Sequence, residues 1–376
     1  MLLFGGVSSS ASEDFFSRHW QIPIPSQSGE TPTPESCGQC HPKQLADWAQ
    51  SQHAKAFSPG LVGQLMQYDS EETISCLACH APLAIQQEQF LDGGEAAIER
   101  WLSDLESLSF SHGVFCVVCH LRQGRIFGPP TNVDTTSPSS SILTPNRYHS
   151  RSKRSPEFED SRFCAPCHQF SQEILVNGKP LENTYREWLD SPYARDGTHC
   201  QSCHMRDRQH LFKGIHDQSF VEQSVSIDVA ITDRKAILKL QSSGVGHRFP
   251  TYVVPRVTLK GGLIDGSGRP VQGSQREKII QRQVRLESDG WEEVSDTRLY
   301  PGESVELIIP LFTGATEKKR VRFEVWVDPD YFYHFITYPR ILEELPDGNS
   351  KNLVKRALIE ARENRYLLFE REIESL

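Results

Sequence analysis

Cys116-Val117-Val118-Cys119-His120 is one of five stretches in which two cysteines lie three positions apart and a histidine follows the second. The other four are Cys37-Gly38-Gln39-Cys40-His41, Cys76-Leu77-Ala78-Cys79-His80, Cys164-Ala165-Pro166-Cys167-His168 and Cys200-Gln201-Ser202-Cys203-His204. Together they contain all ten cysteines of the chain. Two thiols at this spacing can add to the two vinyl groups of one porphyrin, while the imidazole of the next residue reaches the iron. The sequence therefore predicts five covalently bound haem c groups, each with two thioethers and one axial histidine.

Neither disulfides nor zinc sites account well for these paired cysteines. A disulfide framework gives no reason for a histidine after every second cysteine. Zinc ribbons use paired Cys-x-x-Cys knuckles, and an odd number of knuckles cannot pair evenly. Haem c is attached after export, so we expect the chain to work in the periplasm or outside the cell.

The composition excludes some classes of partner. The chain has 376 residues and a net formal charge of −9, so it has no basic excess for binding nucleic acid. No stretch approaches the roughly 18 apolar residues that a membrane span needs. We therefore expect no nucleic-acid partner and no membrane span, and we expect redox proteins as partners.

A chain of this length favours more than one folded part. Residues 1–35 read as an N-terminal tail, whose first residues resemble the end of a signal peptide and whose prolines favour an extended linker. Residues 36–220 contain the five motifs and read as a pentahaem cytochrome c domain. Within it, residues 42–57 and 95–108 favour helices, and residues 128–145 favour a long loop.

After Phe220 the sequence pattern changes, and apolar residues recur at every second position. The alternation is clearest at Val321-Arg-Phe-Glu-Val-Trp-Val327. Further strands are expected over Ala236–Leu240, Val253–Leu259 and Val305–Leu311. Residues 221–348 are thus predicted to form a β-sandwich-like domain, and residues 349–376 a C-terminal helix over Lys351–Ile373. The expected fold is a mainly α multihaem cytochrome c domain with long loops, an antiparallel β-sandwich domain and a C-terminal helix.

Few aliphatic residues lie in the first of these domains. A chain so poor in apolar side chains cannot bury a stable core by itself, whereas buried porphyrins would supply the missing apolar surface. Without haem this half is predicted to be unfolded or molten.

Histidine is the expected ligand at the sixth position of each iron, because the chain has only three methionines. An axial methionine raises haem potential, so its scarcity points to bis-histidine haems of low potential. The predicted distal ligands are His53, His112, His149, His216 and His247. His210 is the alternative to His216, which is preferred because nearby Gly214 permits close approach of the backbone to a porphyrin. The other three, His19, His199 and His334, are expected at the surface or in hydrogen bonds.

One short segment is repeated. Trp48-x-x-Ser51-x-His53-Ala54 is echoed by Trp188-x-x-Ser191-x-Tyr193-Ala194, with tyrosine in place of the candidate ligand. Tyr193 either packs beside a haem or lines an open iron where a small molecule could bind.

Several segments resemble multihaem cytochromes related to hydroxylamine oxidoreductase and its tetrahaem electron-acceptor cytochrome. They are Cys37–Phe57, His112–Pro129, Phe163–His168, Asn183–Trp188 and Cys200–Arg206. Gly246–Pro250 and Asp296–Glu303 resemble the β-domain that follows the haem region in many members. The resemblance implies stacked haems in a mostly helical scaffold and distal ligation by His53, His112 and His247. Catalytic members carry seven or eight haems, and this sequence has no Cys-x-x-Cys-Lys motif.

Three functions remain as hypotheses. The first is a periplasmic or extracellular electron carrier with bis-histidine haems, and this is the preferred one. The second is a redox enzyme that acts on a small nitrogen or sulfur compound at one open iron. The third is a subunit of a polymeric cytochrome, a homo-oligomer in which His19 or His334 completes a neighbour's haem.

Overall fold

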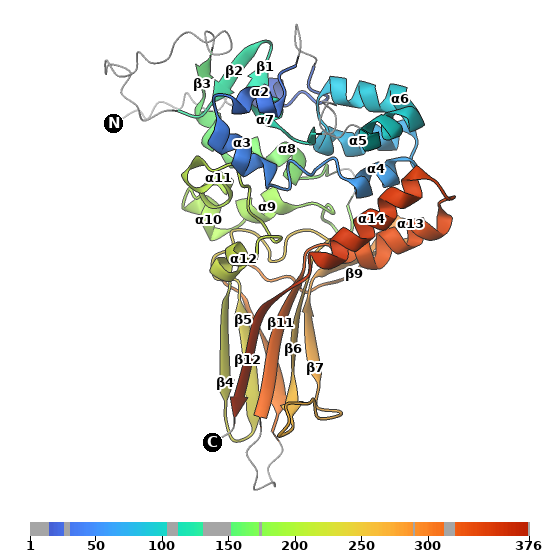
Figure 1. Ribbon diagram of the computed structural model, residues 1–376. Helices are drawn as coiled ribbons and strands as arrows, with labels where there is room; N and C mark the ends of the chain where they lie inside the picture. Colours follow the sequence, from blue (N-terminus) through green and yellow to red (C-terminus); the bar gives the residue numbers. More distant parts are fainter. Residues whose placement is uncertain are drawn as a thin grey trace, which may run out of the picture. The chain divides into compact units, whose positions relative to one another are not determined.

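The computed structural model describes residues 15–25, 31–103, 112–130, 152–172, 175–288, 290–311 and 320–374. The chain forms two compact units (Figure 1). Unit 1 contains Met1–Cys167, His199–Phe212 and Pro346–Leu353, and unit 2 contains His168–Thr198, Lys213–Leu345 and Val354–Leu376. Among the described residues, no helix is both long enough and apolar enough to span a bilayer.

Unit 1 is built mainly from short helices. They are α2 (Pro34–Gly38), α3 (Pro42–Ala49), α4 (Pro59–Leu65), α5 (Ser70–His80), α6 (Ala84–Ser103), α7 (Cys116–His120), α11 (Cys200–His204) and three 3₁₀ turns, η3 (Pro156–Glu159), η4 (Ser161–Phe163) and η5 (Arg206–Arg208). Helix α8 (Ala165–His168) contains most of the fourth motif. The first turns of α2, α3 and α4 each contain a proline, whose fixed φ suits a helix start and whose missing N–H costs nothing there. Three short strands, β1 (Leu121–Arg122), β2 (Arg125–Gly128) and β3 (Lys153–Arg154), form a small sheet.

The apolar core of unit 1 is divided. One cluster of seven buried residues gathers around Leu77 and Phe90, and a second cluster of seven gathers around Trp48 and Phe115. Neither cluster is large enough to resemble the core of an independent domain. The expectation that the motif-bearing half relies on further apolar surface stays a prediction.

Helix α3 is shorter than the sequence predicts. The helix expected over residues 42–57 ends at Ala49, so His53 lies in the turns that follow. The Ser51 hydroxyl donates to the carbonyl of Trp48 at 2.7 Å and accepts from the Ala54 N–H at 3.3 Å. Such side-chain bonds offer the backbone an alternative to the helical ladder and end the helix.

Unit 2 contains two antiparallel sheets and a hairpin. The strands are β4 (Ser226–Ile231), β5 (Lys235–Gln241), β6 (Arg256–Ile264), β7 (Arg276–Ile280), β8 (Arg282–Glu287), β9 (Gly290–Asp296), β10 (Ser304–Pro310), β11 (Arg320–Asp328) and β12 (Tyr366–Glu374). One sheet has the order β10-β5-β4, the other has the order β12-β11-β6-β7, and β8 pairs with β9 (Figure 1). The sequence predicts antiparallel strands at the positions of β5, β6, β10 and β11, and the structure confirms them.

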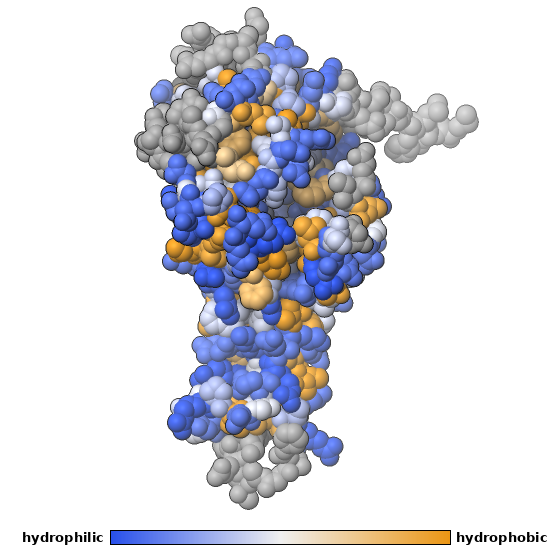
Figure 2. Space-filling model, turned by 90° about the vertical axis from the view of Figure 1, so that its right-hand side faces the viewer, coloured by the Kyte–Doolittle hydropathy of each residue, from blue (hydrophilic) through white to orange (hydrophobic). Residues whose placement is uncertain are grey.

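Alternation along these strands produces the core of unit 2. Val321, Phe323, Val325 and Val327 on β11 are all fully buried, and the residues between them are not. Side chains from both sheets join one hydrophobic cluster that includes Leu238. On the face shown in Figure 2, hydrophilic residues predominate over the strands, as the period of two requires.

The end of the chain differs from the prediction. The sequence favours a helix over Lys351–Ile373, but α14 (Asn349–Glu363) ends earlier and β12 follows it. The helical face is correct as far as Ala361, which is buried against α13 (Tyr338–Glu344) with Val354 and Ala357. Leu368 belongs instead to β12, which pairs with β11 and buries this side chain in the sheet core. A stretch of Tyr, Leu and Phe satisfies its backbone better by pairing with an available strand edge than by extending a solvated helix.

The remaining helices of unit 2 precede β4 in the chain or follow β11. They are α9 (Thr184–Leu189), α10 (Pro192–Arg195), α12 (Gln218–Ser224) and a π-helical turn, η6 (Tyr333–Thr337).

Candidate functional site

Most of the motifs occupy the end of a short helix. Helices α5, α7, α8 and α11 each end at the motif histidine. In the first motif Cys37 belongs to α2, and His41 is the N-cap of α3. Residues three apart lie on one face of a helix, so the two thiols of the motifs in α5, α7 and α11 point to the same side. All ten cysteines are free thiols, and none of them is fully buried.

Thiols of different motifs lie within hydrogen-bond distance of one another in unit 1. The pairs are Cys37 with Cys116, Cys79 with Cys167, and Cys164 with Cys200. The hydrogen bond from Cys116 lowers the pKa of Cys37 to about 7, and that from Cys164 lowers the pKa of Cys200 to about 7. The first motif therefore lies next to the third, and the fourth lies next to the second and the fifth.

Two motif histidines are held in the form that binds a metal. The Nδ1 of His80 lies 2.7 Å from the carbonyl oxygen of Ala56, and that of His120 lies 2.8 Å from the carbonyl oxygen of Phe127. A carbonyl only accepts, so Nδ1 carries the proton and Nε2 keeps its lone pair. Burial lowers the pKa of both rings, that of His120 to about 4, which keeps them neutral at pH 7. A neutral ring oriented through Nδ1 is what an axial haem ligand requires.

The predicted ligands His53 and His112 lie close together in unit 1. The Val114 N–H donates to the carbonyl of His53 at 3.0 Å. Gly113, which follows His112, has φ +58°, and a Cβ at this position would lie 2.7 Å from the His53 carbonyl oxygen. Only glycine fits this turn without strain, which explains the Gly that follows His112.

His247 lies in unit 2 in a loop before β6. Its Nδ1 lies 2.9 Å from the carbonyl of Arg248, so Nε2 again keeps the lone pair. A Cβ at Gly246 would lie 3.4 Å from the Tyr193 ring. The hydroxyl of Tyr193 donates to the carbonyl of Ser243 at 3.3 Å.

His216 and His210 have different surroundings. The Nε2 of His216 lies 3.1 Å from both carboxylate oxygens of Asp330, and a carboxylate accepts its proton. The Nδ1 of His210 lies 3.1 Å from the carbonyl of Arg208, and its ring centre lies 6.1 Å from that of His120. The hydrogen bonds thus occupy the metal-binding nitrogen of His216 but not that of His210.

His149 lies outside the described residues. The three histidines that are not predicted as ligands do form hydrogen bonds. His19 Nε2 donates to the carbonyl of Cys119 at 2.8 Å, His199 Nδ1 accepts from the Ser161 N–H at 3.2 Å, and His334 Nε2 lies 2.8 Å from an oxygen of Asp328.

The short sequence repeat is also a structural repeat. The indole Nε1 of Trp48 donates to the carbonyl of Val114, two residues before the third motif, and that of Trp188 donates to the carbonyl of Thr198, two residues before the fifth. The Thr198 N–H donates to the carbonyl of Tyr193 at 2.8 Å, as the Val114 N–H does to that of His53. Gly197, like Gly113, has a positive φ, of 72°. The sequence shows only the first part of this repeat, because a long insertion separates the two halves of the first copy.

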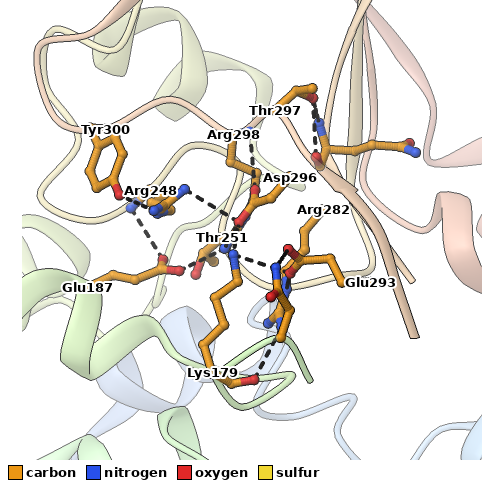
Figure 3. A network of polar contacts seen from close by, with 12 residues as sticks. Lys179, Glu187, Arg248, Thr251, Arg282, Glu293, Asp296, Thr297, Arg298 and Tyr300 are labelled. Carbon is orange, nitrogen blue, oxygen red and sulfur yellow. Dashed lines mark hydrogen bonds and ion pairs between the residues drawn. The ribbon is translucent and has the colours of Figure 1, made fainter. Parts of the chain in front are cut away.

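Unit 2 contains a buried ionic network that the sequence does not reveal (Figure 3). The fully buried guanidinium of Arg298 forms ion pairs with Glu187 on α9 and Asp296 on β9, both at 2.9 Å. Lys179 pairs with Asp296 and, at 3.2 Å, with Glu293. Burial alone would raise the pKa of Asp296, but the hydrogen bond and the charge of Arg298 hold it well below its usual range.

A second part of the network lies close to His247. Arg248 lies 3.4 Å from Asp296, and its backbone N–H donates to Glu187 at 3.3 Å. The network therefore ties the loop of His247 to α9. Charged residues in strands normally face solvent, so only the tertiary structure identifies these as buried.

Comparison with known proteins places the motifs in a wider context. Residues 36–121, which contain the first three motifs, match the family described as cytochrome c554 and c-prime. The crystal structure of a penta-heme cytochrome c552 from Thermochromatium tepidum aligns with 91% of this chain and 98% of its own, with a TM-score of 0.62 and 18% sequence identity. At that identity the likeness shows the fold alone. No curated protein sequence matches the chain. The family match and the shared fold support a multihaem c-type cytochrome.

Proposed function

We propose that the chain is an exported pentahaem c-type cytochrome that transfers electrons in the periplasm or outside the cell. One observation carries the proposal. Each of the five motifs offers two free thiols and an imidazole, and thiols of different motifs lie within hydrogen-bond distance of one another. Bound haem would supply an iron that alternates between the ferric and ferrous states.

The residues of the chain would hold each iron in a fixed environment. The backbone carbonyls of Ala56 and Phe127 orient the rings of His80 and His120 through Nδ1. An imidazole ring held in this way need not move when the iron changes between the ferric and ferrous states. Small structural change between oxidation states is what fast electron transfer requires.

Contacts between motifs support an order of electron transfer. The first motif contacts the third through Cys37 and Cys116, and Cys119 of the third exerts a charge effect on both Cys164 and Cys167 of the fourth. The fourth also contacts the second motif and the fifth. We infer that electrons pass between the first, third and fourth motifs in that spatial order, in either direction, and between the fourth motif and both the second and the fifth.

The proposed distal ligands are His53, His112, His149, His247 and His210. His210 replaces His216 in this set, because the hydrogen bond to Asp330 occupies the metal-binding nitrogen of His216. The partners are proposed to be redox proteins, and the acidic net charge of −9 favours basic ones.

Mass spectrometry of the mature, exported protein tests this function. The expected mass is that of the polypeptide plus five haems, and the ferric protein is expected to give only low-spin electron paramagnetic resonance signals. A polypeptide without added haem mass, or zinc in place of iron, would contradict the proposal.

One observation favours a redox enzyme as the second candidate. Tyr193 occupies in the second copy of the structural repeat the place that His53 has in the first, so this position offers a phenol where the first copy offers an imidazole. Binding of carbon monoxide to the reduced protein would reveal such an open iron. The polymer hypothesis gains no support, because His19 and His334 both use Nε2 in hydrogen bonds within the chain.

A further inference from the structure

Arg122 is a buried cation next to the third motif. It lies on β1, two residues after His120, and only 8% of its surface is exposed. Its guanidinium donates to four backbone carbonyls, those of His19 at 2.5 Å, Val117 at 3.2 Å, Leu121 at 2.7 Å and Val118 at 2.7 Å. Two of these carbonyls, Val117 and Val118, lie between the two motif cysteines.

These bonds use four of the five donors of Arg122 but do not neutralise its charge. A guanidinium has five N–H donors, and a carbonyl oxygen has no formal negative charge. A guanidinium keeps its charge at pH 7 even when it is buried. Among the described residues no carboxylate acts on Arg122, and the side chain that does is Cys119. The guanidinium also faces the ring of Trp20, whose centre lies 5.5 Å from Cζ.

We propose that Arg122 raises the reduction potential of the haem attached at Cys116 and Cys119. The inference rests on the proposed function and concerns one position within it. An uncompensated positive charge in a medium of low dielectric constant favours the reduced iron, which carries one positive charge fewer than the oxidised iron. Arg122 is buried against carbonyls, and no carboxylate of the described residues lies beside it, so it is a fixed electrostatic bias at the third motif.

The expected size follows from Coulomb's law. Two unit charges about 10 Å apart, at an effective dielectric constant of about 20, change an equilibrium constant roughly tenfold. For a one-electron couple a tenfold change corresponds to about 59 mV. In the proposed route the third motif lies between the first and the fourth, so this bias would hold an electron at an intermediate site.

A redox titration of purified holoprotein variants, fitted as five one-electron components, tests the proposal. In Arg122→Gln, the ratio of reduced to oxidised haem in one component should fall about tenfold at the same ambient potential. Arg122→Lys keeps the charge and should leave that component near its wild-type position.

Arg125→Gln is the matched control. Arg125 pairs with Arg122 in the β1–β2 hairpin, but it is exposed, so solvent screens its charge. His120→Met marks the component of the third motif, since a methionine ligand raises haem potential.

A second pair of variants keeps Arg122 in place. Trp20→Glu brings a carboxylate to the guanidinium and should lower the same component, whereas Trp20→Gln should not. The inference is overturned if five haems are attached and Arg122→Gln shifts no component, or if Arg125→Gln or Arg122→Lys shifts it equally. It is also overturned if all components move together. A wild-type protein without haem would contradict the proposed function, and this inference with it.

Discussion

Gly113 shows how a single residue without a side chain can set the geometry of the candidate ligands. Its φ is +58°, and a Cβ would meet the carbonyl oxygen of His53 at 2.7 Å. Gly124 also has a positive φ, of 68°, but a Cβ there would enter open space. The two glycines share the backbone conformation and differ only in what surrounds them.

Substitution by alanine should separate these two contributions. Gly124→Ala should lower the free energy of unfolding by about 1–2 kcal/mol, which is the cost of the left-handed conformation. Gly113→Ala should cost about 3 kcal/mol or more, because the carbonyl of His53 must also move. Denaturant titration of the holoprotein, followed by Soret absorbance, measures both values. Equal losses would show that the close contact at Gly113 is relieved without cost.

His210 and His216 give a residue-scale test of the distal ligand set. His210→Ala should convert one of five haems from low spin to high spin, because it removes a proposed axial ligand. His216→Ala should leave every haem low spin and cost only the interaction with Asp330. Electron paramagnetic resonance of the two ferric variants makes the comparison directly. A high-spin signal from His216→Ala alone would restore the assignment that the sequence favours.

The sequence could predict the thioether sites but not the choice between these two histidines. Two cysteines and a histidine within five consecutive residues define an attachment site by local chemistry alone. The partner of His216, by contrast, is Asp330, 114 residues away in the sequence. No local sequence pattern predicts such a contact. The nearby Gly214 favours His216 as a ligand only through the conformational freedom of its own backbone. The same holds for Arg122, whose burial depends on residues near His19.

At the scale of elements, the ionic network of unit 2 fixes the loop of His247 to α9 and β9. Arg298 has no exposed side-chain surface, and it forms ion pairs with both Glu187 and Asp296. Arg322 on β11 also forms an ion pair, with Glu372 on β12, but it is 31% exposed. Both arginines bridge elements, and their burial differs greatly.

Substitution by methionine should therefore have unequal effects on unfolding. Arg298→Met removes the buried ion pair of Glu187 and one of the ion pairs of Asp296, which keeps Lys179 and Arg248 as partners. This loss should cost about 3–5 kcal/mol. Arg322→Met removes a partly exposed pair and should cost about 0–1 kcal/mol. Chemical denaturation followed by far-ultraviolet circular dichroism measures the difference. A loss below about 1 kcal/mol in Arg298→Met would mean that the two carboxylates take up protons or water instead.

A strand can be predicted from sequence when its own residues alternate between apolar and polar, whatever strand it pairs with. The alternation of β11 identifies a strand by itself, because Val321, Phe323, Val325 and Val327 all face one side. Residues 366–374 have no such alternation, and they form β12 because the edge of β11 is available to pair with them. The early end of α3 has a similar origin, since the hydroxyl of Ser51 competes with a helical bond that the periodicity alone would allow.

At the scale of the whole molecule, the two units differ in how they bury apolar surface. In the described residues, unit 2 has one cluster of 19 buried hydrophobic residues drawn from both sheets, and unit 1 has two separate clusters of seven. Burial of apolar surface is the main term that offsets the loss of chain entropy on folding. Unit 2 can meet this cost with its own side chains. In unit 1 the motifs surround positions that porphyrins would fill in the proposed holoprotein.

This difference predicts that the haem-free chain is folded in one unit only. In a variant with all ten motif cysteines changed to serine, amides of β5 and β11 should remain protected from hydrogen exchange, because their core needs no cofactor. Amides of α5 and α7 should exchange at rates close to those of an unfolded chain, whereas in the holoprotein they should be protected. Hydrogen-exchange mass spectrometry of both forms provides the comparison, with the holoprotein as the control for each peptide. If α5 and α7 stay protected in the serine variant, the small clusters around Leu77 and Phe115 stabilise unit 1 by themselves, and the haems add chemistry to a fold that does not depend on them.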